Sequence, residues 1–193
     1  MSLMKSIKNK LEQKNIISVR NLSRGFFLSD GTSLLIRAIR PDDKQRLLDG
    51  LHHLSNKSVY YRFFRSKHEL TEKELKYFTE VDFNHHVAIV AAIQNVGKEN
   101  DIGVARYIEL KDRGSQRIAE VAFAIDDEYQ HKGVGTLLFK ELVAIAQEQG
   151  IKRLVAEVLL DNKAMLKIFE HSGYKLETTI SNGVATIKFN IAR

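Results

Sequence analysis

A glycine-containing turn is the part of the sequence whose residue types and spacing most clearly predict chemistry. It reads Gln130-His131-Lys132-Gly133-Val134-Gly135-Thr136 and joins an apolar run to an amphipathic segment. Two glycines let a backbone turn tightly and approach a ligand, and the amides that open a helix attract anions. The turn therefore predicts a phosphate or pyrophosphate site. It has neither the ending of a Walker A loop nor the third glycine of the Rossmann fingerprint, and a glycine-rich connection without a ligand is the alternative.

A glutamate, Glu120, lies in the apolar run 119–125 that precedes this turn. Alternation along a strand places Glu120 on the face opposite Val121 and Phe123, together with two alanines. A carboxylate in such a place can act as a general base. The alternative is a glutamate on a solvent-facing surface, although the small neighbours also suit a substrate cleft.

The first half of the chain is predicted to form an antiparallel meander with two helices. Apolar runs around Asp30-Gly31 predict a hairpin, and strands are expected at 86–93, 101–109 and 118–125. One helix begins at Pro41, with four leucines between 47 and 54 as its buried stripe. A second runs from Thr71 to Thr79, and a capping box formed with Glu74 begins it.

The second half predicts a crossover of strand, helix and strand. A helix starts near Gly135 and ends at Gly150, and a strand at 151–160 runs parallel to the strand before the turn. A helix at 162–172 and a strand at 186–191 follow. The expected fold is mixed α/β of the α+β class, with a mostly antiparallel central sheet and one parallel crossover.

The N-terminal segment is expected to be an appendage. Four apolar residues fall at helical spacing among lysines: Leu3, Met4, Ile7 and Leu11. The predicted division is a helical appendage at 1–24 and one domain at 25–193. The helix packs either on this domain or on a second copy of the chain, which leaves a homodimer open.

Composition excludes several classes of protein. The 193 residues contain no cysteine, which excludes zinc fingers, iron–sulfur clusters, disulfide scaffolds and cysteine nucleophiles. No apolar run reaches the roughly 20 residues that span a bilayer, and no secretory signal is evident, so a cytoplasmic protein without a membrane partner is expected. The net charge of +6 is spread along the chain, so no nucleic-acid partner is expected. Adjacent histidines at 52–53 and 85–86 diverge, and no metal site is assigned.

Three motifs in order resemble the GNAT N-acetyltransferases. Gln130-x-x-Gly133-x-Gly135 resembles their acetyl-CoA pyrophosphate loop, and the run 119–125 resembles their fourth strand. The segment from Asn162 to Tyr174 is similar to their asparagine-containing helix, which a glycine and an aromatic residue follow. Because the order and spacing agree from about residue 33 to 190, the resemblance implies an acetyl-CoA-dependent N-acetyltransferase.

The segment from Leu54 to Phe64 further resembles the bacterial protein lysine acetyltransferases of the Pat type. It matches their pattern Leu-Ser-x-x-Ser-x-Tyr-x-Arg-Phe-Phe. This resemblance implies a protein lysine as acceptor and Ser55, Ser58 and Tyr60 as substrate-binding residues. The alternative is that the aromatic residues here belong to the core of the domain.

The family resemblance also assigns roles within the site. It implies that Glu120 is the general base and that a backbone amide at 124–125 polarises the thioester carbonyl. The cofactor-binding residues it implies are Phe123, Ala124, Ile125, Gln130, His131, Lys132, Gly133, Val134, Gly135, Thr136, Asn162 and Phe169. Phe169 stands where many members have a proton-donating tyrosine, so the general acid is unassigned.

Without cysteine no acetyl-cysteine intermediate can form, and direct attack by the amine in a ternary complex is expected. Two alternative functions are left open. One is an acetyltransferase that acts on a small-molecule amine, and the other is a catalytically weak acyl-CoA-sensing module.

Overall fold

The computed structural model describes residues 2–95, 97–110 and 116–192. Across these residues one sheet has the strand order β1-β2-β3-β4-β5-β6-β8-β7. Its strands are β1 (Ser23–Phe27), β2 (Ser33–Ala38), β3 (His86–Asn95), β4 (Lys98–Glu109), β5 (Ile118–Ile125), β6 (Arg153–Leu159), β7 (Leu176–Ser181) and β8 (Val184–Asn190). The helices are α1 (Ser2–Arg20), α2 (Lys44–His53), α3 (Asn56–Phe63), α4 (Glu72–Thr79), α5 (Val134–Glu148) and α6 (Lys163–Glu170), with short 3-10 turns η1 (Pro41–Asp43) and η2 (Asp127–Tyr129).

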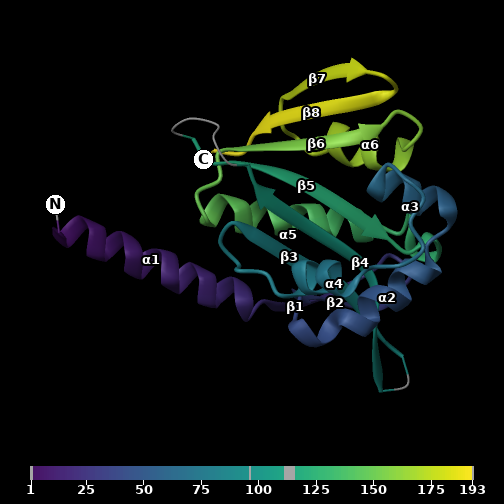
Figure 1. Ribbon diagram of the computed structural model, residues 1–193, viewed down its shortest axis with the longest axis horizontal. Helices are drawn as coiled ribbons and strands as arrows, with labels where there is room; N and C mark the ends of the chain where they lie inside the picture. Colours follow the sequence, from purple (N-terminus) through teal and green to yellow (C-terminus); the bar gives the residue numbers. More distant parts are fainter. Residues whose placement is uncertain (1, 96, 111–115, 193) are drawn as a thin grey trace.

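The pairing of β5 with β6 is the parallel step in an otherwise antiparallel sheet. These two strands pair at Ile118 with Arg153, at Ala119 with Leu154 and at Glu120 with Val155. Beyond these pairs the strands diverge, whereas β5 stays paired with β4 up to Ile125 (Figure 1). The mixed α/β fold with one parallel crossover is confirmed.

Helices cover the two faces of the sheet unequally. The short helices α2, α3 and α4 lie over one face and the long helix α5 lies over the other (Figure 1). The main core forms around α5, where Leu138 and Leu142 are fully buried. A smaller apolar cluster holds the short helices together, and it consists of Leu51, Val59, Leu70 and Leu75. The face under α2 to α4 therefore has less apolar packing than the face under α5.

Local signals account for where the helices begin and end. Thr71 and Glu74 form the expected capping box at the start of α4, and Gly150 follows α5 with φ +81°. The polar stretch 55–58 starts a helix, because the Ser55 hydroxyl accepts a hydrogen bond from the amide of Ser58 and so caps α3. This helix carries the aromatic segment that follows.

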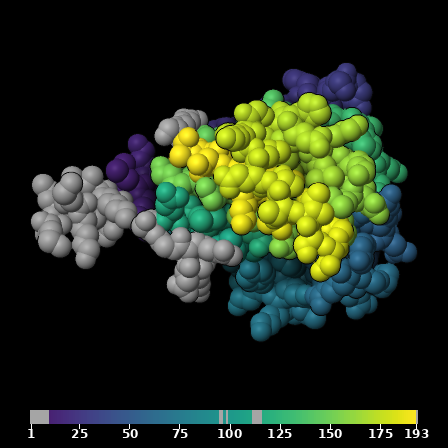
Figure 2. Space-filling view, turned by 90° about the horizontal axis from the view of Figure 1, so that it is seen from above, coloured from purple at the N-terminus to yellow at the C-terminus, as the bar shows by residue number. Residues whose placement is uncertain are grey.

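Strand β7 was not predicted, because its residues from Glu177 to Ser181 are exposed and give no apolar alternation. In Figure 2, α6 and the strands β6 to β8 (yellow-green) form one broad patch of the surface, and residues of α3 and α4 (blue) lie along its lower border.

Helix α1 projects from the rest of the molecule (Figure 1). Near its C-terminal end Val19 is 3% exposed in the main core, while Leu11 is 57% exposed. The side chains of Leu3, Met4 and Ile7 lie outside the described residues. The division of the chain at residues 24 and 25 stays a prediction. Within the described residues, no helix has the length and apolar character needed to span a bilayer.

Candidate active site

The divergence of β5 and β6 opens two adjoining hollows. One, of about 590 Å³, lies at the end of β5 near the glycine turn, and the other, of about 610 Å³, lies beside Glu120. The residues that line both are Tyr61, Arg62, Phe123, Asn162 and Met165. A continuous groove therefore runs along the edge of β5 that β6 leaves unpaired.

The glycine turn ends this groove with a row of backbone amides. The amide of Leu137 donates to the carbonyl of Gly133 at 3.0 Å and makes the first helical bond of α5. The amides of residues 131–136 make no hydrogen bond within the described part of the chain. No acidic side chain lies in the first turn of α5. Such amides at the positive end of a helix dipole form an anion site.

The two glycines of the turn have different functions. Gly133 has φ +90°, a conformation that favours glycine, and a Cβ there would meet nothing within 4 Å. At Gly135 a Cβ would lie 2.7 Å from Cδ1 of Ile168, so this glycine allows α5 and α6 to pack closely. Of the other turn residues, Val134 is buried, whereas His131, Lys132 and Thr136 are exposed.

The predicted substrate-binding serines connect α3 to the turn. Asp127 accepts hydrogen bonds from the hydroxyls of Ser55, at 3.0 Å, and Ser58, at 2.8 Å, and from the amide of Ser55 at 2.8 Å. Burial alone would raise the pKa of Asp127, but these hydrogen bonds outweigh it and lower the pKa. Gln130 joins them, because its Nε2 donates to the Ser58 hydroxyl at 3.2 Å and to the carbonyl of Ile125 at 3.1 Å.

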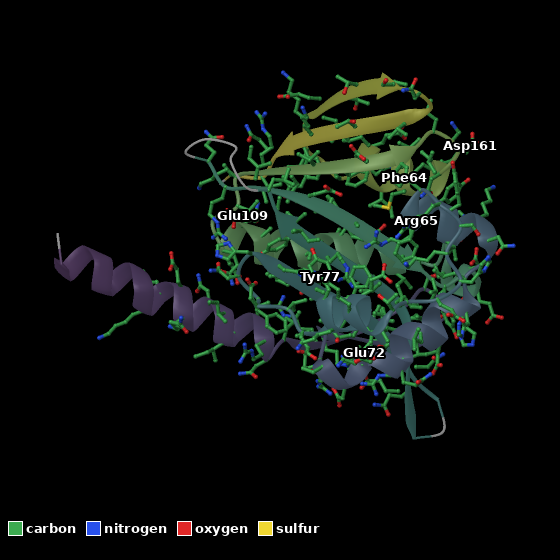
Figure 3. All side chains as sticks on the ribbon, in the orientation of Figure 1. Phe64, Arg65, Glu72, Tyr77, Glu109 and Asp161 are labelled. Atoms are coloured by element: carbon green, nitrogen blue, oxygen red, sulfur yellow. The ribbon has the colours of Figure 1, made fainter. Side chains whose placement is uncertain are left out.

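The neighbouring tyrosines of α3 differ in their surroundings. Tyr60 is 48% exposed and lines neither hollow, whereas Tyr61 lines both. The Tyr61 hydroxyl donates to the carbonyl of Asp161 at 2.9 Å and so holds α3 against the start of α6. Phe64 and Asp161 lie at this same end of the molecule (Figure 3). Substrate binding by Ser55, Ser58 and Tyr60 stays a prediction.

Glu120 lies at the last paired position of β5 with β6, where the second hollow begins. The Glu120 side chain is exposed to solvent on one side. Partial burial of its carboxyl raises the pKa, the nearby Glu157 raises it further, and Arg62 opposes both. A carboxylate with a raised pKa is a better general base near neutral pH than an ordinary glutamate.

Arg62 is a site residue that the sequence analysis did not single out. Arg62 lines both hollows. Its guanidinium lies 5.0 Å from the ring centroid of Phe63, and within the described residues it makes no hydrogen bond or ion pair. Burial lowers its pKa, and the charge of Glu120 opposes that shift. A signal was present, because Arg62 follows Ser58 by four residues, and this spacing places the two on one helix face.

The two predicted residues of α6 also line the groove. Asn162 caps the helix, and its Oδ1 accepts from the amide of Met165 at 3.1 Å. Phe169 is fully buried and packs on Phe123 and Phe139 with ring centroids 6.5 and 5.6 Å apart. Its ring forms part of the wall of the hollow beside Glu120 and has no proton to donate.

The described residues contain no group of three metal-ligating side chains.

Comparison with known proteins identifies the class to which this fold and groove belong. Residues 33–175 match the family model described as the acetyltransferase (GNAT) domain. The chain belongs to the GNAT family of acetyltransferases.

Two individual proteins resemble this chain more specifically. It is 34% identical to the acetyltransferase Pat of Mycolicibacterium smegmatis over 143 residues, which cover 74% of this chain and 41% of that protein. The chain thus spans about four tenths of that relative's length. The crystal structure of the GNAT domain of S. lividans PAT is 33% identical and superposes with a TM-score of 0.78, covering 87% of this chain and 96% of that domain.

A third protein shares the fold. It comes from Salmonella typhimurium and was solved with its cofactor acetyl-CoA. It is 16% identical, has a TM-score of 0.66, and covers 83% of this chain and 95% of its own.

Proposed function

We propose that this protein transfers the acetyl group of acetyl-CoA to the side-chain amine of a protein lysine, by direct attack within a ternary complex. One observation carries the proposal. The groove has the unbonded amides of residues 131–136 at one end and the carboxylate of Glu120, whose pKa is raised, at the other end. Anion binding and proton removal are the two tasks that this reaction requires of the protein.

The dimensions of the groove fit a long, phosphorylated co-substrate. From Glu120 to Ile125 a strand extends roughly 17 Å, and residues 121–125 of β5 face the divergence without a β6 partner. The amides of residues 131–136 would hold the pyrophosphate, and the free edge of β5 would pair with the amide groups of the pantetheine arm. Asn162, which lines both hollows, would hydrogen-bond that arm.

The proposed chemistry assigns the proton transfer to Glu120. Its carboxylate takes a proton from the lysine ammonium, and the neutral amine then attacks the thioester carbonyl carbon. The new C–N bond forms as the C–S bond breaks, and an amide of β5 near Ala124 polarises the carbonyl oxygen. Phe169 has no proton to give, so the departing thiolate is protonated by another donor.

Likeness to Pat and the surface beside Glu120 support a protein acceptor. Phe64, which lines the hollow with Glu120, is 38% exposed, and Tyr60 on the same helix is 48% exposed. Exposed aromatic side chains of this kind are common where proteins bind one another. A docked chain could present a lysine to Glu120 while contacting α3.

The experiment measures thiol release from acetyl-CoA with lysine-containing proteins and with small amines. Glu120→Gln is expected to lower kcat by roughly 10²- to 10⁴-fold, the usual contribution of a general base, with the Kd for acetyl-CoA unchanged. Wild-type activity should fall as the pH drops through the raised pKa of Glu120, because the base must be unprotonated. Glu177→Gln, at an exposed position on β7, is the matched control and should behave as wild type.

Three results would contradict this proposal. A Glu120→Gln variant with wild-type kcat would remove the assigned base. Faster turnover of small amines than of every protein tested would remove the lysine acceptor and favour the small-molecule alternative. Binding of acetyl-CoA without turnover on either panel would favour an acyl-CoA sensor.

A further inference from the structure

A separate cavity lies between the sheet and the three short helices. Its empty volume is about 690 Å³, which includes space open to solvent. Its walls are mainly apolar, and they include Ile39, Leu47, Leu51, Phe63, Phe78 and Val104. Glu120 and the glycine turn do not line it, although Leu54, Arg62 and Ala124 line both this cavity and the groove. We call it the α2–α4 cavity.

The carboxylates in its wall already have partners. Asp43 accepts two hydrogen bonds from Arg37 and is also paired with Arg46. Asp101 lies 3.2 Å from Arg37 and 3.6 Å from Arg46. Asp126 accepts a hydrogen bond from the amide of Glu128 and lies 3.9 Å from His53. Besides Arg46, two more arginines line the cavity, Arg62 and Arg106. Within the described residues, none of these acids forms an ion pair with either of them.

Arg106 is one of those two arginines and is 3% exposed. Its Nη1 donates to the carbonyl of Phe78 at 3.3 Å and contacts Nε2 of His86 at 3.1 Å, while Nε is buried without a hydrogen-bond partner. The guanidinium lies 4.5 Å from the ring centroid of Phe78. Burial and, second, the like charge of Arg62 lower the pKa of Arg106 to about 9. Arg106 therefore remains charged at neutral pH without a counter-ion.

Arg62 is the second of these two arginines, and it is half-buried. It lines the cavity from α3, and it too has no ion-pair partner within the described residues. His86 adds no charge beside Arg106, because burial and then Arg106 lower its pKa to about 4 and keep it neutral at pH 7. Two guanidiniums of like charge thus line one apolar cavity, an arrangement that is costly unless an anion joins them.

We propose that the α2–α4 cavity binds a small organic carboxylate with an apolar body. The carboxylate group pairs with Arg106 and Arg62, whose planar guanidiniums suit carboxylate oxygens. The apolar body lies against the leucines and phenylalanines of α2 to α4. Because neither Glu120 nor the glycine turn lines the cavity, binding of this ligand does not require the proposed reaction. Through Arg62 the ligand also reaches the groove.

The test measures binding of octanoate to the full chain by calorimetry and by thermal shift. Octanoate is expected to bind and to raise Tm, whereas the uncharged analogue octanamide and inorganic sulfate are expected to bind at least about tenfold more weakly. Arg106→Met should weaken octanoate binding roughly tenfold to a hundredfold, the usual contribution of hydrogen bonds to a charged group. The ligand-free variant should have a higher Tm than wild type, because it no longer buries an unpaired charge.

Arg65→Met is the matched control. Arg65 is 66% exposed beyond α3 and lines no part of this cavity, so the variant should bind octanoate as wild type does. Three results would overturn the proposal: no octanoate binding at millimolar concentration, equal binding of octanamide, or undiminished binding by Arg106→Met. An equal rise in Tm with sulfate would contradict the proposal that the ligand has an apolar body. The first two comparisons use the wild-type protein and hold even if a variant fails to fold.

Discussion

Arg37 on β2 and Arg106 on β4 lie on the same face of the sheet, and both are buried, yet their surroundings are opposite. Arg37 is fully buried among Asp43, Glu99 and Asp101, and it hydrogen-bonds to all three. Arg106 has no carboxylate partner in the described part of the chain. Burial of an arginine is stable where the protein supplies the counter-charge. The charge of Arg37 is thus neutralised within the protein, whereas the charge of Arg106 is the one that the proposed ligand would neutralise.

The largest expected effect is at the paired arginine. Arg37→Met should lower the free energy of unfolding by about 3 to 5 kcal/mol, because it leaves buried carboxylates without a counter-ion. Urea unfolding at neutral pH measures this loss. Arg24→Met is the control, because Arg24 forms an exposed pair with Glu141 and its removal should cost less than about 1 kcal/mol. Equal losses for the two variants would mean that the Arg37 cluster has no special stabilising role.

A smaller effect, which depends on pH, is expected at Asp101 in the same cluster. Burial raises its pKa to about 6, against the opposing charge of Arg37. Because the folded-state pKa lies above the unfolded value, the stability linked to this group is present at low pH and is lost as the pH rises through 6. The Tm of Asp101→Asn should therefore improve relative to wild type between about pH 4 and about pH 8.

Asp43→Asn provides the opposite case. Hydrogen bonds from Arg37 and Arg46 lower the pKa of Asp43 despite its burial. Its stabilising contribution is therefore present above the unfolded pKa and is lost as the pH falls through the folded one. Asp43→Asn should be most damaging near neutral pH. Parallel pH profiles of Tm for the two variants would contradict the assigned difference between these carboxylates.

The smallest effect concerns the unpaired arginine that reaches the groove. The charge of Arg62 lowers the pKa of Glu120, so Arg62→Gln should raise that pKa. The acidic limb of the kcat profile should then move to higher pH, because a larger fraction of the base is protonated at any given pH. Arg62→Lys keeps the charge and should move the limb less. An unmoved limb in Arg62→Gln would show that the two groups do not interact.

Local sequence was sufficient to predict the parts of the site that depend on local geometry. The turn at 130–136 needs glycine at a positive φ, and the strand with Glu120 shows its alternation in eight residues. The capping box of α4 was equally local. Each of these features depends on residues within a single turn or strand, so the types and spacing of those residues are enough to predict it.

The remaining features depend on contacts between distant segments. Arg106 lies within an apolar strand, and nothing in its neighbourhood tells whether its partner is a carboxylate, as for Arg37, or a phenylalanine ring and a neutral histidine. The end of pairing after Glu120 depends on how β6 diverges from β5 while it stays paired with β8. Strand β7 escaped prediction because an exposed edge strand needs no apolar face.

The hydrogen bonds around Asp127 have a kinetic consequence. Through Ser55 and Ser58 they connect the start of α3 to the turn whose amides would hold the pyrophosphate. We expect that a co-substrate bound to this turn would also stabilise α3, whose Tyr61 and Arg62 line the groove. We therefore expect a compulsory order of addition, in which acetyl-CoA binds to the free enzyme and the acceptor binds only to the binary complex.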